Sequence, residues 1–134
     1  MIQERDILKI KLSSIFVDDQ EKALKFYTEV LGFVKKVDIP AGEYRWLTVI
    51  SPEGPDDLES VLEPNANPAA KTYQDAIYKQ GIPATSFSVD DIQEEYERLI
   101  NLGVVFNMKP TEMEGVTIAI FDDTCGNFIQ LYQV

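Results

Sequence analysis

Apolar and polar positions along this chain follow a strand pattern and then a helix pattern. Residues 7–17 are rich in β-branched residues and alternate loosely, which predicts a strand. Asp18 or Asp19 is expected to cap a helix, and Gly32 to end it in the left-handed conformation. Three further strands are expected at 33–38, 44–51 and 58–63, separated by turns rich in proline and glycine. The helix itself is indicated by apolar residues at the spacing of one helix face: Ala23, Phe26, Tyr27, Val30 and Leu31.

The second half of the chain repeats this order. A strand is expected at 83–89, a helix from Asp90 or Asp91 to Leu102 with Gly103 after it, and strands at 104–108, 116–121 and 127–134. Val17-Asp18-Asp19 aligns with Val89-Asp90-Asp91, so the chain contains two copies of one module. We therefore predict an α+β fold in which two tandem βαβββ modules form curved mixed sheets around a cleft, with helices outside. One domain spans 1–134, with modules at about 7–63 and 82–134.

The segment between the modules, residues 64–81, is longer than a simple connector. Prolines and asparagines make its first part irregular, and 71–80 has the apolar spacing of a short helix. The sequence favours a packed linker, although long connecting segments also serve as lids or as contacts between subunits.

Composition narrows the class of protein. The 134 residues are 45% apolar and 26% charged, which is typical of one globular domain. A net charge of −11 argues against nucleic acid as a partner, and no apolar run approaches the ~20 residues of a membrane span. The acidic balance favours a neutral or cationic small molecule, or it serves solubility alone. The lone Cys125 cannot form an internal disulfide, so we expect a cytoplasmic protein.

Four motifs, in order, resemble one known superfamily. They are Leu12-x-x-Ile15-x-Val17-x-Asp19, Phe26-Tyr27-x-x-x-Leu31-Gly32-Phe33, Leu58-Glu59-x-x-Leu62-Glu63-Pro64 and Asp122-Asp123-x-x-Gly126-Asn127-x-x-Gln130-Leu131. Together the motifs resemble those of the vicinal oxygen chelate proteins, which include glyoxalase I, extradiol dioxygenases and bleomycin-resistance proteins. This resemblance implies a ligand cleft, built within one chain or between two subunits, and a homodimer.

The resemblance also implies a metal site, for which this chain lacks the ligands. The family holds one divalent metal through four side chains, and the matching positions here are Leu12, Glu59, Ala84 and Gln130. Metalloenzymes of the family usually carry histidine at the first and third positions, whereas this chain has no histidine at all. Catalytic transition-metal sites need about three protein ligands. We therefore expect no metal and no other cofactor.

Alternation along the strands assigns residues to the expected cleft. The cleft face carries both apolar and polar side chains, as small-molecule sites usually do. Trp46 could stack a planar ligand there or pack in the core. The opposite, apolar face is expected to pack under the helices through Ile15, Val17, Phe87, Val89, Ile129 and Leu131. The candidate ligand-binding residues are Leu12, Ser14, Phe16, Trp46, Glu59, Ala84, Ser86, Phe128 and Gln130.

Two functions are consistent with these residues. The first is a glyoxalase/bleomycin-resistance-like protein that binds a small molecule without a metal. The alternative is a glyoxalase-like lyase or isomerase in which Glu59 is the catalytic base, with or without a weakly held divalent cation. The sequence leaves open whether the protein is an enzyme.

Overall fold

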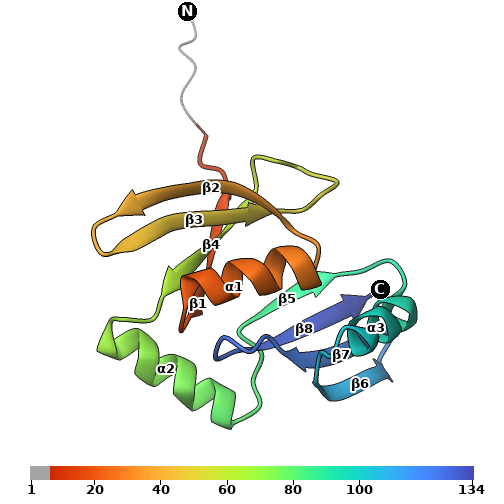
Figure 1. The fold of residues 1–134 in the computed structure, drawn as a ribbon. Helices are drawn as coiled ribbons and strands as arrows, with labels where there is room; N and C mark the ends of the chain where they lie inside the picture. The colour runs from red at the N-terminus through yellow and green to blue at the C-terminus, as the bar shows by residue number, and fades with distance from the viewer. Residues whose placement is uncertain (1–6) are drawn as a thin grey trace, which may run out of the picture.

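Two four-stranded sheets form the framework of the computed structural model, which describes residues 7–134 (Figure 1). The strands of the first sheet are β1 (Leu12–Val17), β2 (Val34–Ala41), β3 (Tyr44–Ile50) and β4 (Glu59–Pro64), in the spatial order β1-β4-β3-β2. Those of the second are β5 (Thr85–Ser88), β6 (Phe106–Met113), β7 (Val116–Asp122) and β8 (Phe128–Gln133), in the order β5-β8-β7-β6. In each sheet the first strand is parallel to the last, and the other pairs are antiparallel. The predicted pair of βαβββ modules is confirmed.

The helix of each module begins at the second aspartate of its Val-Asp-Asp motif. The Asp19 carboxylate accepts a hydrogen bond from the Lys22 amide at 3.0 Å before α1 (Gln20–Lys25). Asp91 accepts one from the Glu94 amide at 3.1 Å before α3 (Ile92–Asn101). Of the two aspartates allowed by the sequence at each start, the second is therefore the cap.

The first helix differs from the prediction in its last turns. After α1 the chain continues as a π-helix, η1 (Phe26–Val30), in which the Leu31 amide donates to the Phe26 carbonyl at 3.0 Å. The wider turn rotates the following residues around the helix axis, and the 3.6-residue repeat of an α-helix does not predict this rotation. Phe26 and its neighbour Tyr27 are both buried in this segment.

Several strand limits also differ from the sequence prediction. The first strand begins at Leu12 and not at residue 7, because its partner β4 begins at Glu59, whose amide donates to the Lys11 carbonyl at 2.9 Å as the last bond of the ladder. Ile10 accordingly lies outside the strand and is 89% exposed. β2 continues through Pro40, which an edge strand tolerates because its outer amides need no partner. β6 extends to Met113, well beyond the predicted 104–108.

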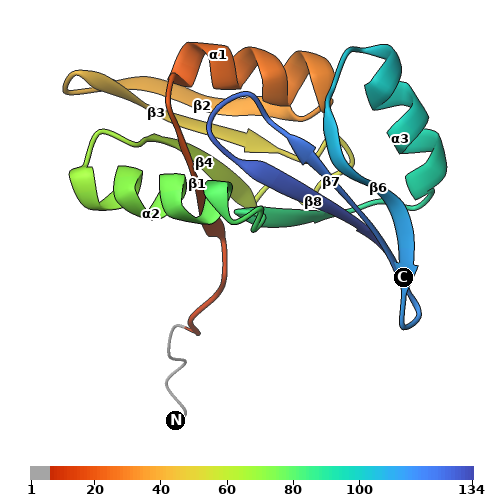
Figure 2. The same ribbon diagram turned by 90° about the horizontal axis from the view of Figure 1, so that it is seen from below.

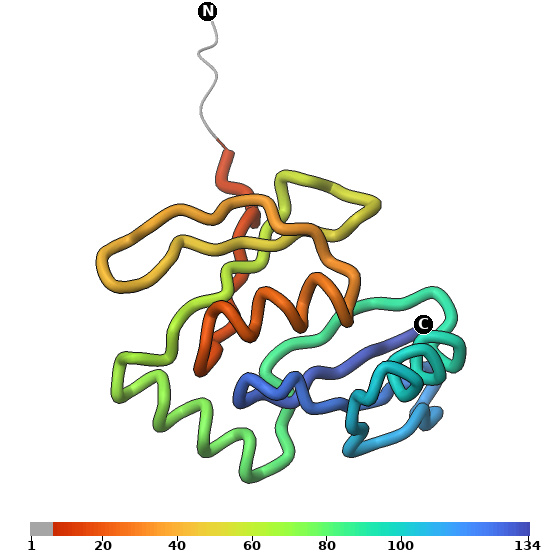
Figure 3. The backbone as a smooth tube through the Cα atoms, viewed as in Figure 1, coloured from red at the N-terminus to blue at the C-terminus, as the bar shows by residue number. Residues whose placement is uncertain are grey.

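One hydrophobic core joins the two modules. Its members come from the helix-covered faces of both sheets and from the helices. The Phe26 ring lies 6.2 Å from that of Phe121, and the Phe33 ring lies 4.9 Å from that of Phe87. Figure 3 shows the orange helix of the first module lying next to the blue and green strands of the second. The predicted packing face is confirmed, since Ile15, Val17, Ile129 and Leu131 are buried and Phe87 and Val89 pack against this core.

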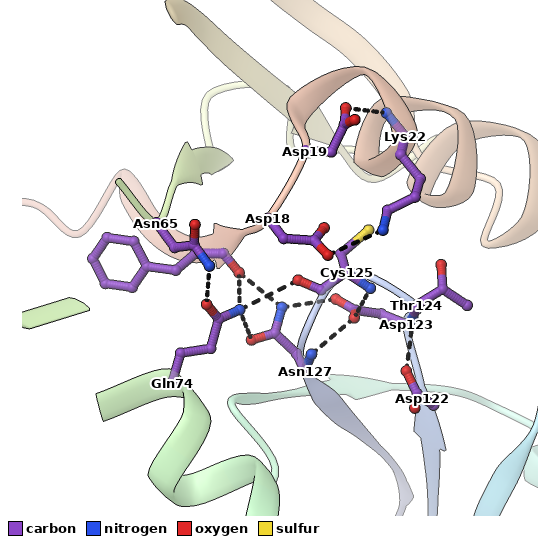
Figure 4. A network of polar contacts seen from close by, with 11 residues as sticks. Asp18, Asp19, Lys22, Asn65, Gln74, Asp122, Asp123, Thr124, Cys125 and Asn127 are labelled. Carbon is purple, nitrogen blue, oxygen red and sulfur yellow. Dashed lines mark hydrogen bonds and ion pairs between the residues drawn. The ribbon is translucent and has the colours of Figure 1, made fainter. Parts of the chain in front are cut away.

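The segment between the modules forms α2 (Pro68–Lys79), which lies across the end of β1 (Figure 2). Gln74 on α2 is only 2% exposed, and its amide nitrogen donates to the Phe16 carbonyl at 3.0 Å and to Asn127 Oδ1 at 3.0 Å. The Asn65 amide donates to Gln74 Oε1 at 2.7 Å (Figure 4). Because Gln74 bonds to residues of both modules, the segment is a packed linker. No helix within residues 7–134 is long and apolar enough to cross a membrane.

Candidate ligand-binding site

One face of the first sheet is left open by the helices, and the strand register identifies its residues. Leu12 pairs with Glu59 and Ser14 pairs with Val61 in the parallel ladder, so each pair points to the same side. Their neighbours Ile15 and Leu62 are buried under the helices. Thr48 pairs with Val61 across β3 and β4. We call this side the first open face; its members are Leu12, Ser14, Phe16, Trp46, Thr48, Glu59 and Val61.

Glu59 on this face is already bonded within its own sheet. The Thr48 hydroxyl donates to Glu59 Oε1 at 2.7 Å, and Lys36 Nζ lies 3.6 Å from Oε2. Thr48 is fully buried and also accepts the Val37 amide at 3.2 Å. The Glu59 carboxylate is therefore fixed in position and partly neutralised. Neither Thr48 nor Lys36 could be identified from the sequence, because both lie on other strands and reach Glu59 only in the folded sheet.

The apolar part of the first open face is accessible to solvent. Trp46 is 38% exposed and Leu12 is 50% exposed. Ile39 stands opposite Trp46 in the β2–β3 ladder and extends the same exposed surface. Trp46 is thus available to a planar ligand.

Arg45, next to Trp46, points to the other side of the sheet. Its guanidinium bonds Asp38 Oδ2 at 2.7 Å and Glu21 Oε1 at 2.9 Å. The hydrogen bonds from Arg45 lower the pKa of the Asp38 carboxyl below its ordinary value. Neighbouring residues on a regular strand are expected to point to opposite sides in this way.

The second sheet has a corresponding open face. Ser86 pairs with Gln130, and the Gln130 amide donates to the Ser86 hydroxyl at 3.1 Å. The Ala84 amide donates to the Phe128 carbonyl at 2.8 Å, just before β5. We call this side the second open face; its members are Ala84, Ser86, Phe128, Gln130 and Tyr132.

The linker helix covers part of the second open face. The Tyr78 ring of α2 stacks on Phe128 with centroids 4.5 Å apart and planes 5° from parallel. The Tyr78 hydroxyl donates to Asp122 Oδ2 at 2.6 Å, and this bond raises the pKa of Tyr78. One side of the Phe128 ring is therefore occupied by the protein itself, a contact that the apolar spacing of α2 did not reveal.

The two open faces belong to separate sheets. The modules meet through their helix-covered faces, so each open face points away from that contact. Within residues 7–134, no strand pair or hydrogen bond joins a member of one face to a member of the other. A single chain thus groups most of the predicted site residues into two sets, one around Glu59 and one around Gln130. Only Glu59 and Ser86 meet across the modules, where both line one hollow of about 310 Å³.

The four side chains at the family's metal positions do not fit a transition metal. Leu12 and Ala84 carry no lone pair, the Gln130 amide bonds Ser86, and the Glu59 carboxylate is held by Thr48 and Lys36. Metal sites of this kind need several imidazole, thiolate or carboxylate ligands. Over the range 7–134, no three histidine, cysteine or acidic side chains are grouped so that they could hold an ion.

A buried polar network near the start of β8 was not foreseen as such. Asp123, in the loop after β7, is fully buried and accepts the Tyr27 hydroxyl at 2.6 Å. It also accepts the Asn127 side-chain amide at 2.8 Å (Figure 4). Burial raises the pKa of Tyr27 far above its usual range, so its hydroxyl remains a donor. Burial also raises the pKa of the Cys125 thiol to about 12, so Cys125 is no thiolate nucleophile at neutral pH.

Comparison with known proteins agrees with this architecture. The chain is 58% identical over 126 residues to the uncharacterized protein YurT of Bacillus subtilis (strain 168), with 94% of this chain and 99% of YurT covered. The solved structure of UcmS2 matches with a TM-score of 0.80 and 33% identity, covering 95% of this chain and 98% of UcmS2. TnmS3, described as an antibiotic binding protein from Streptomyces sp. CB03234, matches with a TM-score of 0.76 and 30% identity, covering 97% and 98%.

The family itself is established by a match over most of the chain. Residues 9–131 match the family model, and this range contains all four motifs in full, seven of the eight strands and most of β8. The protein therefore belongs to the Glyoxalase/Bleomycin resistance protein/Dioxygenase superfamily.

Proposed function

We propose that this protein binds a planar, partly apolar small molecule on its open faces, without the help of a metal. The observation that carries this proposal is the exposed apolar surface of the first open face around Trp46 and Leu12, set beside the fixed polar group formed by Glu59 and Thr48. Such a combination of apolar surface with a few positioned polar groups is usual for small-molecule sites. The similarity to TnmS3, an antibiotic binding protein, supports the same class of ligand.

A second copy of the chain would complete the site. β1 and β5 are each an edge strand of their sheet within residues 7–134. The edge of β1 faces its own chain, because the Phe16 carbonyl accepts the side-chain amides of Gln74 and Asn127, so a second copy would meet the open faces and not this edge. In a homodimer, the first open face of one subunit would be set against the second open face of the other. We also propose a cytoplasmic location, consistent with a single buried thiol.

The lyase or isomerase alternative has less support. It requires Glu59 as a base, and this carboxylate is held between the Thr48 hydroxyl and the Lys36 ammonium. A general base must reach the proton that it removes, and both carboxylate oxygens already have partners. We therefore assign Glu59 a positioning role at the ligand site.

Trp46 provides the test, because it is the only tryptophan in the chain and lies on the first open face. Titration with a panel of planar aromatic antibiotics, such as an anthraquinone and a quinoline, should quench its fluorescence. Leu12→Lys places a charged chain on this face and should weaken binding at least about tenfold. Leu102→Lys is the matched control, since Leu102 is 52% exposed and follows α3, away from both faces.

Two results would contradict the proposal. Equal binding by the Leu12→Lys and Leu102→Lys variants would show that the ligand lies elsewhere. Full affinity in a chain that sediments as a monomer would refute the shared site between subunits.

A further inference from the structure

A groove runs between the two modules, and its central part lies on the helix-covered side of the sheets. Its central part is a hollow of about 300 Å³ whose floor includes the side chains of Phe87 and Leu131 from the second sheet and Leu99 from α3. Phe33, just after η1, forms the wall on the first module. Phe87 and Leu131 belong to the helix-covered face, so this hollow is separate from the proposed site around Trp46.

The groove continues in both directions from this apolar centre. Phe33, Ser51 and Phe87 also line a neighbouring hollow of about 310 Å³, whose other walls carry the hydroxyls of Ser13, Ser60 and Thr85. Glu59 and Ser86, one from each open face, also line this hollow, so this end of the groove reaches the edges of both open faces. The Ser13 and Ser60 hydroxyls bond one another at 3.1 Å. In the other direction the groove opens into a wider hollow between the 51–57 loop and the start of α3. The modules therefore enclose one continuous groove with an apolar middle and two polar ends.

The wide end of the groove is strongly acidic. Five carboxylates line it, and Arg98 is the only basic side chain among its lining residues. Arg98 is itself ion-paired with Glu95, so its charge is largely compensated. The excess of negative charge lies next to the Phe33 and Phe87 rings, which attract cations through their faces.

From this arrangement we infer a second small-molecule site, selective for an organic cation: an apolar or aromatic body lies against Phe33 and Phe87, and its ammonium group lies at the acidic end. The apolar body is held by removal of its surface from water, and the ammonium by the surrounding carboxylates. An anion of the same shape meets uncompensated carboxylates and is rejected. This inference stands independently of the ligand proposed for the open faces.

The test uses two naphthalene compounds of similar size, 1-naphthylmethylammonium and 1-naphthaleneacetate, measured by titration calorimetry on the intact protein. The cation should bind at least about tenfold more tightly than the anion, and added salt should reduce this difference. Equal affinities for the two compounds, or no binding of the cation at millimolar concentration, would overturn the inference.

Two matched serine variants separate this site from the open faces. Ser51 is exposed on the rim of the groove, and Ser14 is exposed on the first open face. Ser51→Trp should abolish binding of the naphthyl cation and leave binding of the planar aromatic ligand unchanged. Ser14→Trp should have the reverse effect. Loss of cation binding in Ser14→Trp alone would place the cation on the open face and refute the second site.

Folding and assembly are checked in the same variants. Thermal unfolding shows whether Ser51→Trp is folded, and Ser51→Leu, a smaller apolar side chain at the same position on the rim, replaces it if it is not. Sedimentation tests whether a second copy fills the groove. A Ser51→Trp protein that changes its oligomeric state would show that the groove is an interface between chains, which overturns its assignment to a small molecule.

Discussion

On the first open face a carboxylate, Glu59, stands opposite Leu12. At the corresponding place in the second module the phenyl ring of Phe128 lies beside Ala84 and is stacked under Tyr78. Gln130, which the family motif matches with Glu59, stands two residues further along, opposite Ser86. The two modules keep the same strand order and the same helix caps, whereas their open faces differ in charge and aromatic content. The two modules thus share one backbone fold, but the side chains on their open faces differ in chemistry.

The largest difference in the stability effect of corresponding substitutions is expected in the loop before the last strand of each module. Asp123→Ala leaves the Tyr27 hydroxyl and the Cys125 and Asn127 amides without their acceptor in the core. We expect a loss of about 3–5 kcal/mol in the free energy of unfolding, measured by urea denaturation. In the first module Asp57 precedes β4 and is exposed, so Asp57→Ala should change stability by less than about 0.5 kcal/mol. Similar losses in both variants would refute a specific role for the buried network.

Two glycines with similar backbone angles allow the cost of an added Cβ against α2 to be compared with its cost in open space. Gly126 has φ +99°, and an added Cβ would lie 2.7 Å from Gln74 Nε2. Gly103 has φ +89°, and a Cβ added there would have no other atom within 4 Å. Gly103→Ala should cost about 1 kcal/mol through backbone strain alone, and Gly126→Ala about 2–3 kcal/mol. Chemical denaturation of both variants gives the difference, and equal costs would mean that α2 moves aside freely.

The helix caps should be the point at which the modules are most alike. Asp19→Ala and Asp91→Ala each remove one acceptor from the first turn of a helix, at a cost of about 1 kcal/mol. Thermal unfolding of the two variants should therefore give nearly equal shifts. Asp90→Ala, one residue before a cap, is the control and should have almost no effect. A cap variant without effect in one module would show that its helix is held by packing alone.

The smallest expected effect concerns how the stability contributions of Asp38 and Asp123 change with pH, which they should do in opposite directions. Arg45 lowers the pKa of Asp38, so the stability that Asp38 contributes is present above its unfolded-state pKa and is lost as the pH falls through the folded-state value. Burial raises the pKa of Asp123, so its contribution is greatest at low pH and declines as the pH rises through the folded-state value.

Unfolding free energies from about pH 3 to pH 6 test both signs. The stability difference between wild type and Asp38→Asn should grow with rising pH, and that between wild type and Asp123→Asn should shrink. Slopes of the same sign for the two variants would contradict this assignment of the charges.

The regular parts of this fold could be predicted from the sequence. Alternation and helical spacing depend on local geometry, so they identified both modules, and they placed Ile15 and Leu131 in the core. The register between β1 and β4 then put Leu12 and Glu59 on the same side, as alternation had suggested.

Contacts between distant segments could not be predicted in this way. The Thr48 and Lys36 partners of Glu59, the stacking of Tyr78 on Phe128, and the bond from Tyr27 to Asp123 join residues far apart in the chain. The π-helix was missed because its wider turn departs from the repeat on which spacing arguments rest. The proposed site shared by the two open faces requires a second copy of the chain, and patterning along one chain describes only the contacts within that chain.

The outward direction of both open faces has a practical consequence for protein engineering. Residues such as Leu12, Ser14 and Trp46 alternate with core residues along their strands and take no part in the contact between modules. On the proposed function, a library of substitutions limited to these positions would vary the bound compound while the core sequence stays constant. The scaffold is therefore suited to directed evolution of new receptors, with the modules diversified one at a time.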